Sequence, residues 1–271
     1  MQHILEAPFI KEFSDILDIM YRNGWHERNS GNISYMLTEE ETNKYTNHLQ
    51  PFKTIPLDIE VSDLALKTLY VTASGRYIKN VSKNPMLNAG LIRVSSCGRF
   101  VDLIWGFEED GKPTSELPTH LLSHQQRLKV DPTHKVVIHT HATNLLAMSF
   151  VHELDERSFT RTLWKMTTEA IVVFPDGVGV LPWMLCGNKE IGILTAKKMK
   201  DQRIVVWAMH GVFATGTSLD DCFGLIETVE KSAQIYMMTS HIKKVNTIED
   251  AQLKLLAETF KANYKKHYLD S

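Results

Sequence analysis

The chain has 271 residues, of which 43% are hydrophobic and 23% charged, a composition that predicts one soluble globular domain over residues 1–271. Its 30 Lys and Arg against 32 Asp and Glu give a formal charge of −2, which excludes strong general attraction to nucleic acid or to an anionic membrane. Three cysteines without CxxC spacing argue against a disulfide framework, and no apolar run approaches the roughly 18 residues of a membrane span, so we expect a cytoplasmic protein.

The N-terminal region predicts a helix followed by polar loops. Apolar residues recur at helical spacing from Phe9 to Met20, and Gly24 then ends the pattern. A small polar loop, Asn29–Asn32, follows. The stretch Thr38–Asn47 has no sustained apolar period, which indicates an exposed excursion rather than a linker between domains.

The rest of the chain alternates irregularly between strand and helix patterns. Runs rich in β-branched and aromatic residues predict strands at Leu69–Thr72, Leu91–Val94, Phe100–Trp105, Val136–His139, Ile171–Phe174 and Ile204–Ala208. Helical spacing recurs at Ala142–Phe150, Glu190–Met199, Leu219–Tyr236 and Glu249–Phe260. Several strands follow one another without an intervening helix, so we predict a single-domain α/β/α sandwich with a central mixed or largely antiparallel sheet.

Three histidines are candidate metal ligands. His139 and His141 follow a buried-type strand two residues apart, so the period of a strand directs both imidazoles to the same side. His210 also lies where a predicted strand gives way to a loop, and three imidazoles leave zinc an open catalytic position. An HxH pair alone is weak, because a chain with 12 histidines produces such pairs by chance.

His120 and His124 form a second pair, four residues apart on a predicted helix. This spacing also suits a shared metal. The neighbouring leucines favour helix packing and solvent exposure instead.

Two small polar loops and one carboxylate are further candidates. The loops Asn29–Asn32 and Thr72–Gly75 offer amides and hydroxyls to a phosphate, although loops of this composition are also ordinary turns. Glu116 lies between Pro113 and Pro118, which predicts a stiff, extended segment that presents an acid/base group. The alternative places Thr114 or Ser115 at a helix N-cap and Glu116 in the first turn.

Five motifs in chain order resemble the class II aldolase and adducin family: Glu27–Asn32, Thr72–Gly75, Pro113–Pro118, His139–Asn144 and His210–Phe213. The stretches Val173–Gly179 and Leu181–Trp183 resemble the branch that cleaves ketose 1-phosphates. The similarity extends from about residue 9 to about residue 240. Ser30 and Ala73 depart from the glycines that the resemblance leads us to expect.

The resemblance implies an aldolase with one Zn²⁺ per subunit on His139, His141 and His210, and with Glu116 as the catalytic acid/base. It implies substrate phosphate contacts from these residues: Asn29, Asn32, Ser74, Gly75 and Ser115. It also implies a homotetramer in which Glu169 acts across a subunit boundary on the aldehyde half of the substrate; locally, Glu169 is an ordinary strand-entry residue. The alternatives are an L-fuculose-phosphate aldolase, a ribulose-5-phosphate 4-epimerase and, more distantly, an adducin-like scaffold without activity.

Overall fold

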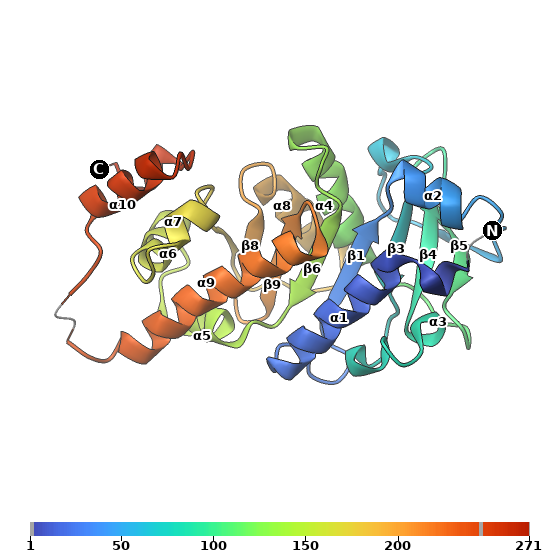
Figure 1. Cartoon of the computed structure of the whole chain (residues 1–271), viewed down its shortest axis with the longest axis horizontal. Helices are drawn as coiled ribbons and strands as arrows, with labels where there is room; N and C mark the ends of the chain where they lie inside the picture. The colour runs from blue at the N-terminus through green and yellow to red at the C-terminus, as the bar shows by residue number, and fades with distance from the viewer. Residues whose placement is uncertain (1–2, 244–245, 271) are drawn as a thin grey trace.

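The computed structural model of the chain describes residues 3–243 and 246–270 (Figure 1). Its strands form one sheet in the order β2-β5-β4-β3-β1-β6-β9-β8-β7. They are β1 (Asn32–Met36), β2 (Lys53–Pro56), β3 (Thr68–Thr72), β4 (Ala89–Val94), β5 (Phe100–Gly106), β6 (Val136–Thr140), β7 (Gly179–Leu181), β8 (Ile204–Trp207) and β9 (Gly211–Gly216). Among these pairings only β7 with β8 is parallel, so the predicted mixed, largely antiparallel sheet is confirmed.

The helices pack on both faces of this sheet. The α-helices are α1 (Pro8–Arg22), α2 (Glu39–Tyr45), α3 (Pro85–Asn88), α4 (Leu117–Val130), α5 (Thr143–Val151), α6 (Glu156–Trp164), α7 (Ala170–Val173), α8 (Lys189–Lys198), α9 (Leu219–Thr239) and α10 (Asp250–Thr259). Short 3-10 helices are η1 (Ile4–Glu6), η2 (Ser62–Leu64), η3 (Ile78–Asn80) and η4 (Lys266–Tyr268). Helices α1, α5, α8, α9 and α10 confirm the predicted helical segments, with boundaries shifted by a few residues.

Two segments differ from the sequence expectations. The run Ile171–Phe174 is not a strand: it overlaps the short helix α7, whose Ala170 and Ile171 are buried, and the Trp164 indole donates a hydrogen bond to the Phe174 carbonyl. Periodicity does not distinguish a short apolar strand from a buried helical turn, and here packing on α9 and α10 decides. The polar stretch Thr38–Asn47 contains the helix α2, whose first turn is stabilised by a capping box between Thr38 and Glu41.

Alternation along β1 distributes its side chains between two layers of core. Ile33 and Tyr35 belong to the hydrophobic cluster that includes residues of α1 and α9. Asn32 and Ser34 point to the opposite face, where Ser34 contacts α4. In Figure 1, α1 and α9 lie in front of the sheet, and α4 and α8 lie behind it. The sheet is therefore the middle layer of a sandwich, and its rear face carries polar groups beside α4.

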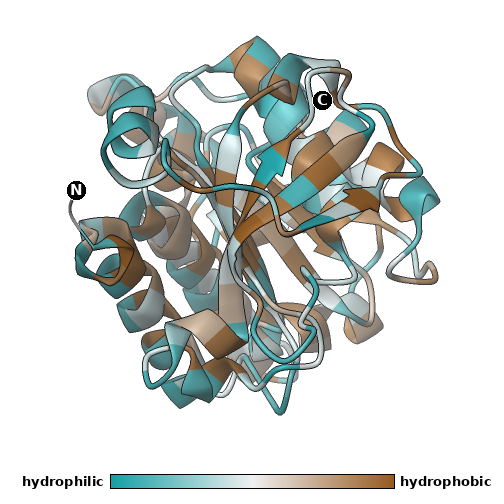
Figure 2. Cartoon of the chain, turned by 90° about the vertical axis from the view of Figure 1, so that its right-hand side faces the viewer, coloured by the Kyte–Doolittle hydropathy of each residue, from teal (hydrophilic) through white to brown (hydrophobic). Residues whose placement is uncertain are grey.

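The hydropathy pattern agrees with these layers. Figure 2 shows hydrophobic residues along the sheet and on the inward sides of the helices, with hydrophilic residues on the outer turns. None of the described helices combines the length and apolarity needed to cross a bilayer.

Candidate active site

The three predicted metal ligands meet at one end of the central strands. His139 lies on β6, His141 follows that strand, and His210 lies in the turn between β8 and β9. The ring centroids are 5.3 Å apart for His139 and His141, 4.9 Å for His139 and His210, and 5.2 Å for His141 and His210. One ring nitrogen from each lies within 4.8 Å of the others, which is close enough for all three to bind one ion.

Hydrogen bonds fix the ring orientation of two of these imidazoles. Nδ1 of His139 lies 2.9 Å from the Val212 carbonyl oxygen, and Nδ1 of His141 lies 2.9 Å from Oε1 of Glu27. Both partners accept, so each Nδ1 carries the proton and each Nε2 keeps a free lone pair. Burial lowers the pKa of His139 well below its usual value and that of His210 to about 4, so both are neutral at pH 7. This donor set fits a divalent ion such as zinc.

Glu116 lies directly beside the histidine cluster. It is the N-cap residue of α4, with φ −91° and ψ 12°, so it is neither extended nor in the first helical turn as the two sequence interpretations had it. Its Oε2 lies 3.5 Å from Nε2 of His139 and accepts a 2.8 Å hydrogen bond from Nδ2 of Asn32. Burial raises the pKa of Glu116 to about 7 against the lowering effect of the Asn32 bond. Such a carboxyl group is suited to both taking and giving a proton near neutral pH.

The two small polar loops complete the pocket. Its lining residues are Asn29, Ser30, Gly31, Asn32, Ala73, Ser74, Gly75, Thr114, Ser115, Glu116, His139, His141 and His210. Every predicted site residue except Glu169 is among them. Gly31 has φ +75°, and a Cβ there would lie 2.2 Å from the ring of buried His26, so this loop position requires glycine.

Asn32 has a second partner that sequence reasoning missed. Its Nδ2 donates to Glu116, and its Oδ1 receives a hydrogen bond from Nε2 of His120. Both polar ends of the side chain are therefore occupied. A phosphate contact from this side chain, as the resemblance implies, would replace one of these bonds.

His120 and His124 lie on helix α4 and pack against the sheet, as predicted, but the predicted solvent exposure is wrong, since they are 0% and 1% exposed. Nδ1 of His120 lies 2.7 Å from Oγ of Ser34, and Nε2 of His124 lies 2.8 Å from the same oxygen. The helical i, i+4 spacing was the signal that these rings share a face. Their partner on β1 could not be identified before the strand pairing was known.

Glu169, Glu27 and Cys186 differ in their distance from the pocket. Glu169 is exposed at the start of α7 and does not line this pocket. Glu27 lay in a recognised motif without an assigned role, and it bonds His141. Exposed Cys186 was given no role, yet its Sγ lies within 4.8 Å of a carboxylate oxygen of Glu116 and a ring nitrogen of His210. The loop that follows the Leu181–Trp183 motif therefore reaches the edge of the pocket.

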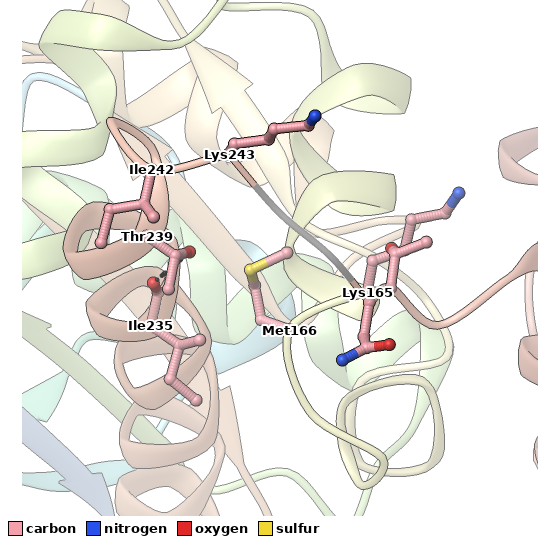
Figure 3. A pocket seen from close by; sticks show the side chains of 8 residues that line it. Lys165, Met166, Ile235, Thr239, Ile242 and Lys243 are labelled. Carbon is pink, nitrogen blue, oxygen red and sulfur yellow. Dashed lines mark hydrogen bonds between the residues drawn. The ribbon is translucent and has the colours of Figure 1, made fainter.

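A second pocket in the structure has, among its described residues, none of the kinds that could bind a metal or exchange a proton as Glu116 could. It lies beside the end of α9, where Lys165, Met166, Ile235, Thr239, Ile242 and Lys243 surround it (Figure 3). Asn246 and Thr247 complete the described lining, in which no residue is His, Cys, Asp or Glu. It therefore lacks both the candidate metal ligands and the carboxyl group that the first pocket brings together.

Comparison with known proteins identifies the family of this chain. The family model described as Class II Aldolase and Adducin N-terminal domain matches residues 11–237. A Listeria monocytogenes protein named rhamnulose-1-phosphate aldolase is 51% identical over 271 residues, covering 99% of this chain and 98% of the relative. An Enterococcus faecalis protein of the same name is 50% identical over 269 residues, covering 99% and 96%.

A solved structure with a similar fold is the sugar-phosphate aldolase from Thermotoga maritima. It superposes with a TM-score of 0.75 at 27% identity, covering 88% of this chain and 97% of that one. The family model spans most of the chain, and the two curated relatives are similar over nearly their whole length. The chain therefore belongs to the class II aldolase and adducin family.

Proposed function

We propose that this protein cleaves L-rhamnulose 1-phosphate reversibly to dihydroxyacetone phosphate and L-lactaldehyde, as a step of rhamnose catabolism. The observation that carries an aldol reaction is the buried Glu116 carboxyl group beside three histidines that converge on one point. The choice of substrate is supported by the relatives of about 50% identity that bear this enzyme's name. The protein is a class II aldolase and thus a lyase.

The histidines and Glu116 have separate parts in this proposal. His139, His141 and His210 bind one Zn²⁺ per subunit, which supplies a Lewis acid for the negative charge that develops on the ketose oxygens. When the bond between carbons 3 and 4 breaks, the hydroxyl on carbon 4 loses its proton to solvent and becomes the aldehyde carbonyl, the bonding electron pair stays with carbon 3, and Glu116 gives a proton to carbon 3. In the condensation direction it removes the same proton, as microscopic reversibility requires. Asn32 orients the Oε2 atom that takes part in this exchange.

The two polar loops bind the phosphate of the substrate. Ser74, Gly75, Ser115 and Asn29 line the same pocket as Glu116, whereas the Asn32 side chain would have to exchange its bond to Glu116 or His120 for a phosphate contact. Hydroxyl and amide donors at loops of this kind can hold an anion without a cationic patch. Their binding energy positions the ketone for reaction.

The assembly and the compartment are also part of the proposal. A homotetramer would bring Glu169 of one subunit to the pocket of another, where it acts on the aldehyde half of the substrate. Its exposure at the start of α7 leaves its side chain open to a neighbouring subunit. A single domain and a cytoplasmic location accord with the composition.

Two other activities use the same set of residues. An L-fuculose-phosphate aldolase and a ribulose-5-phosphate 4-epimerase differ from the proposed enzyme in substrate, so kcat/KM measured for each sugar separately discriminates among the three. An adducin-like binding scaffold would need neither an acid/base residue nor a metal site. The presence of Glu116 beside three converging histidines argues against such a scaffold.

One experiment tests substrate, reaction and metal together. Purified protein is incubated with L-rhamnulose 1-phosphate, and dihydroxyacetone phosphate is measured before chelation, after chelation and after zinc is returned. We expect product that disappears with the chelator and returns with zinc. Preference for another ketose phosphate would change the substrate assignment, and folded, metal-free protein without turnover on any of the sugars would favour the scaffold.

A further inference from the structure

A continuous chain of hydrogen bonds runs from α4 through β1 to Glu116. It links the side chains of His124, Ser34, His120, Asn32 and Glu116 in that order. The distances between the bonded heavy atoms are 2.8 Å from His124 to Ser34, 2.7 Å from Ser34 to His120, and 2.8 Å from Asn32 to Glu116. All five residues are buried, with exposures of 8% or less, so water does not compete for these bonds.

The carboxylate end fixes one direction for the first bond of this chain. An ionised Glu116 can only accept, so Asn32 must turn its Nδ2 toward Oε2 and its Oδ1 away. If the amide were reversed, two oxygens would face each other. The favourable orientation therefore needs a donor opposite Oδ1, and the group there is Nε2 of His120.

The other end of the chain makes His120 such a donor. A neutral imidazole protonated on Nε2 must accept on Nδ1, and the Ser34 hydroxyl lies 2.7 Å from that nitrogen. The Ser34 hydroxyl can donate to Nδ1 of His120 and at the same time accept from Nε2 of His124, which lies 2.8 Å from the same oxygen. Burial lowers the pKa of His120 well below its usual range, which agrees with a neutral ring. Each donor in the chain thus faces one acceptor.

We propose that His120 is a positioning residue for the acid/base carboxyl group: its Nε2–H, kept on that nitrogen by Ser34 and His124, holds Asn32 in the orientation that donates to Glu116. This inference rests on the role proposed for Glu116. It adds that the correct tautomer of a residue on α4, on the rear side of the sheet, is needed for full catalytic rate. His120 does not line the pocket, so it acts only through Asn32.

A matched pair of substitutions separates positioning from packing. In His120→Gln, the side-chain NH₂ lies about where Nε2 of histidine lies and can still donate to Asn32. In His120→Asn, the shorter side chain can still bond Ser34 but does not reach Asn32. Both variants lose the packing of the ring against Phe213, whose centroid lies 5.4 Å away. Their difference therefore reports the bond to Asn32.

We expect the zinc-loaded His120→Asn enzyme to lose about tenfold to a hundredfold in kcat, the scale of one hydrogen bond in a chain to a charged group, while KM changes much less. His120→Gln should recover most of that loss. Ser123→Ala is the control, because Ser123 is buried on the same helix and its hydroxyl has no hydrogen-bond partner among the described residues. Equal kcat losses in both His120 variants, or wild-type kcat in His120→Asn, would overturn the proposal.

A second measurement does not depend on turnover. Nitrogen-15 NMR of histidine-labelled, zinc-loaded wild-type protein reports which ring nitrogen carries the proton, and the His120 signals are identified by their absence in the His120→Gln spectrum. We expect the Nε2–H tautomer. The Nδ1–H tautomer, or a doubly protonated ring at pH 7, would refute the inference even if the proposed substrate also proved wrong. Conversely, the expected tautomer without activity toward L-rhamnulose 1-phosphate would count against the proposed substrate only.

Discussion

Two histidine pairs face the same side of one sheet and have different surroundings. His139 and His141 are two residues apart at the end of β6, and each directs Nδ1 to an acceptor and leaves Nε2 free. His120 and His124 are four residues apart on α4, and both bond the Ser34 hydroxyl. The first pair lines the pocket together with His210, whereas the second lies behind it.

The hydrogen-bond partners of an imidazole decide whether it can bind a metal. Acceptors on Nδ1 prepare a ring for a metal on Nε2. A ring whose two nitrogens both have protein partners, as in His120, has no lone pair left to bind an ion. Glu116 connects the two histidine pairs. Its Oε2 lies 3.5 Å from Nε2 of His139 and accepts a hydrogen bond from Asn32, which is bonded in turn to His120.

The largest effect is expected from His141→Ala, which removes one of the three converging ligands. Zinc content and aldolase activity should both fall to background, while circular dichroism and the free energy of unfolding change little, because the hydrophobic core does not include this site. His48→Ala, at an exposed position, is the control. Full zinc occupancy and normal turnover in His141→Ala would remove this residue from the metal site.

The next largest effect is expected from Glu116→Gln, at the junction of the two pairs. Glutamine can still accept from Asn32 but cannot exchange a proton, so zinc content should persist and kcat should fall by about two to four orders of magnitude. The variant should also fail to exchange the enolisable proton of dihydroxyacetone phosphate with deuterated water.

Glu108→Gln, at an exposed position after β5, is a control for the loss of one carboxylate. Proton exchange at the wild-type rate in Glu116→Gln would show that a different group moves the proton. Glu116 would then be a pocket-lining charge at the start of α4 without a part in the chemistry.

A smaller effect is expected from Ser74→Ala, which leaves both histidine pairs intact. If the loop binds phosphate, KM for the phosphorylated ketose should rise about tenfold or more, the cost of one hydrogen bond to a charged group, and kinetics with unphosphorylated L-rhamnulose should not change. Ser82→Ala, an exposed serine bonded to Asp18, is the control. An equal change for both ketoses would mean that the Thr72–Gly75 loop is only a turn.

The smallest loss of activity is expected from His124→Ala, in the pair behind the pocket, because the Ser34 hydroxyl can still donate to Nδ1 of His120 without His124. The lost buried ring and its bond to Ser34 should lower the free energy of unfolding by about 2–4 kcal/mol, measured by urea denaturation, while zinc content stays complete. This is the reverse of the His141→Ala result. Loss of zinc from His124→Ala with little change in stability would erase the distinction between the two pairs.

Much of the architecture could be predicted from local sequence pattern. Strands such as β6 and helices such as α9 have a composition and a period that specify them without reference to the rest of the chain. β1 and β9 were missed, because Asn32–Met36 and Gly211–Gly216 contain small or polar residues and owe their conformation to pairing on both sides with neighbouring strands. The strand predicted at Ile171–Phe174 was wrong for a related reason, since packing on neighbouring helices decided the conformation of this segment.

The sequence by itself determined the mixed α/β architecture, the family and the short motifs in which the candidate chemistry resides, because residue type, period and motif order are local properties of the chain. Only the tertiary structure decided which side chains meet. The register that places Asn32 opposite His139 brings a β1 amide to the candidate metal ligands, and the packing of α4 on the rear face adds His120 behind it. These contacts join residues more than 80 positions apart, and no local pattern encodes such a pairing.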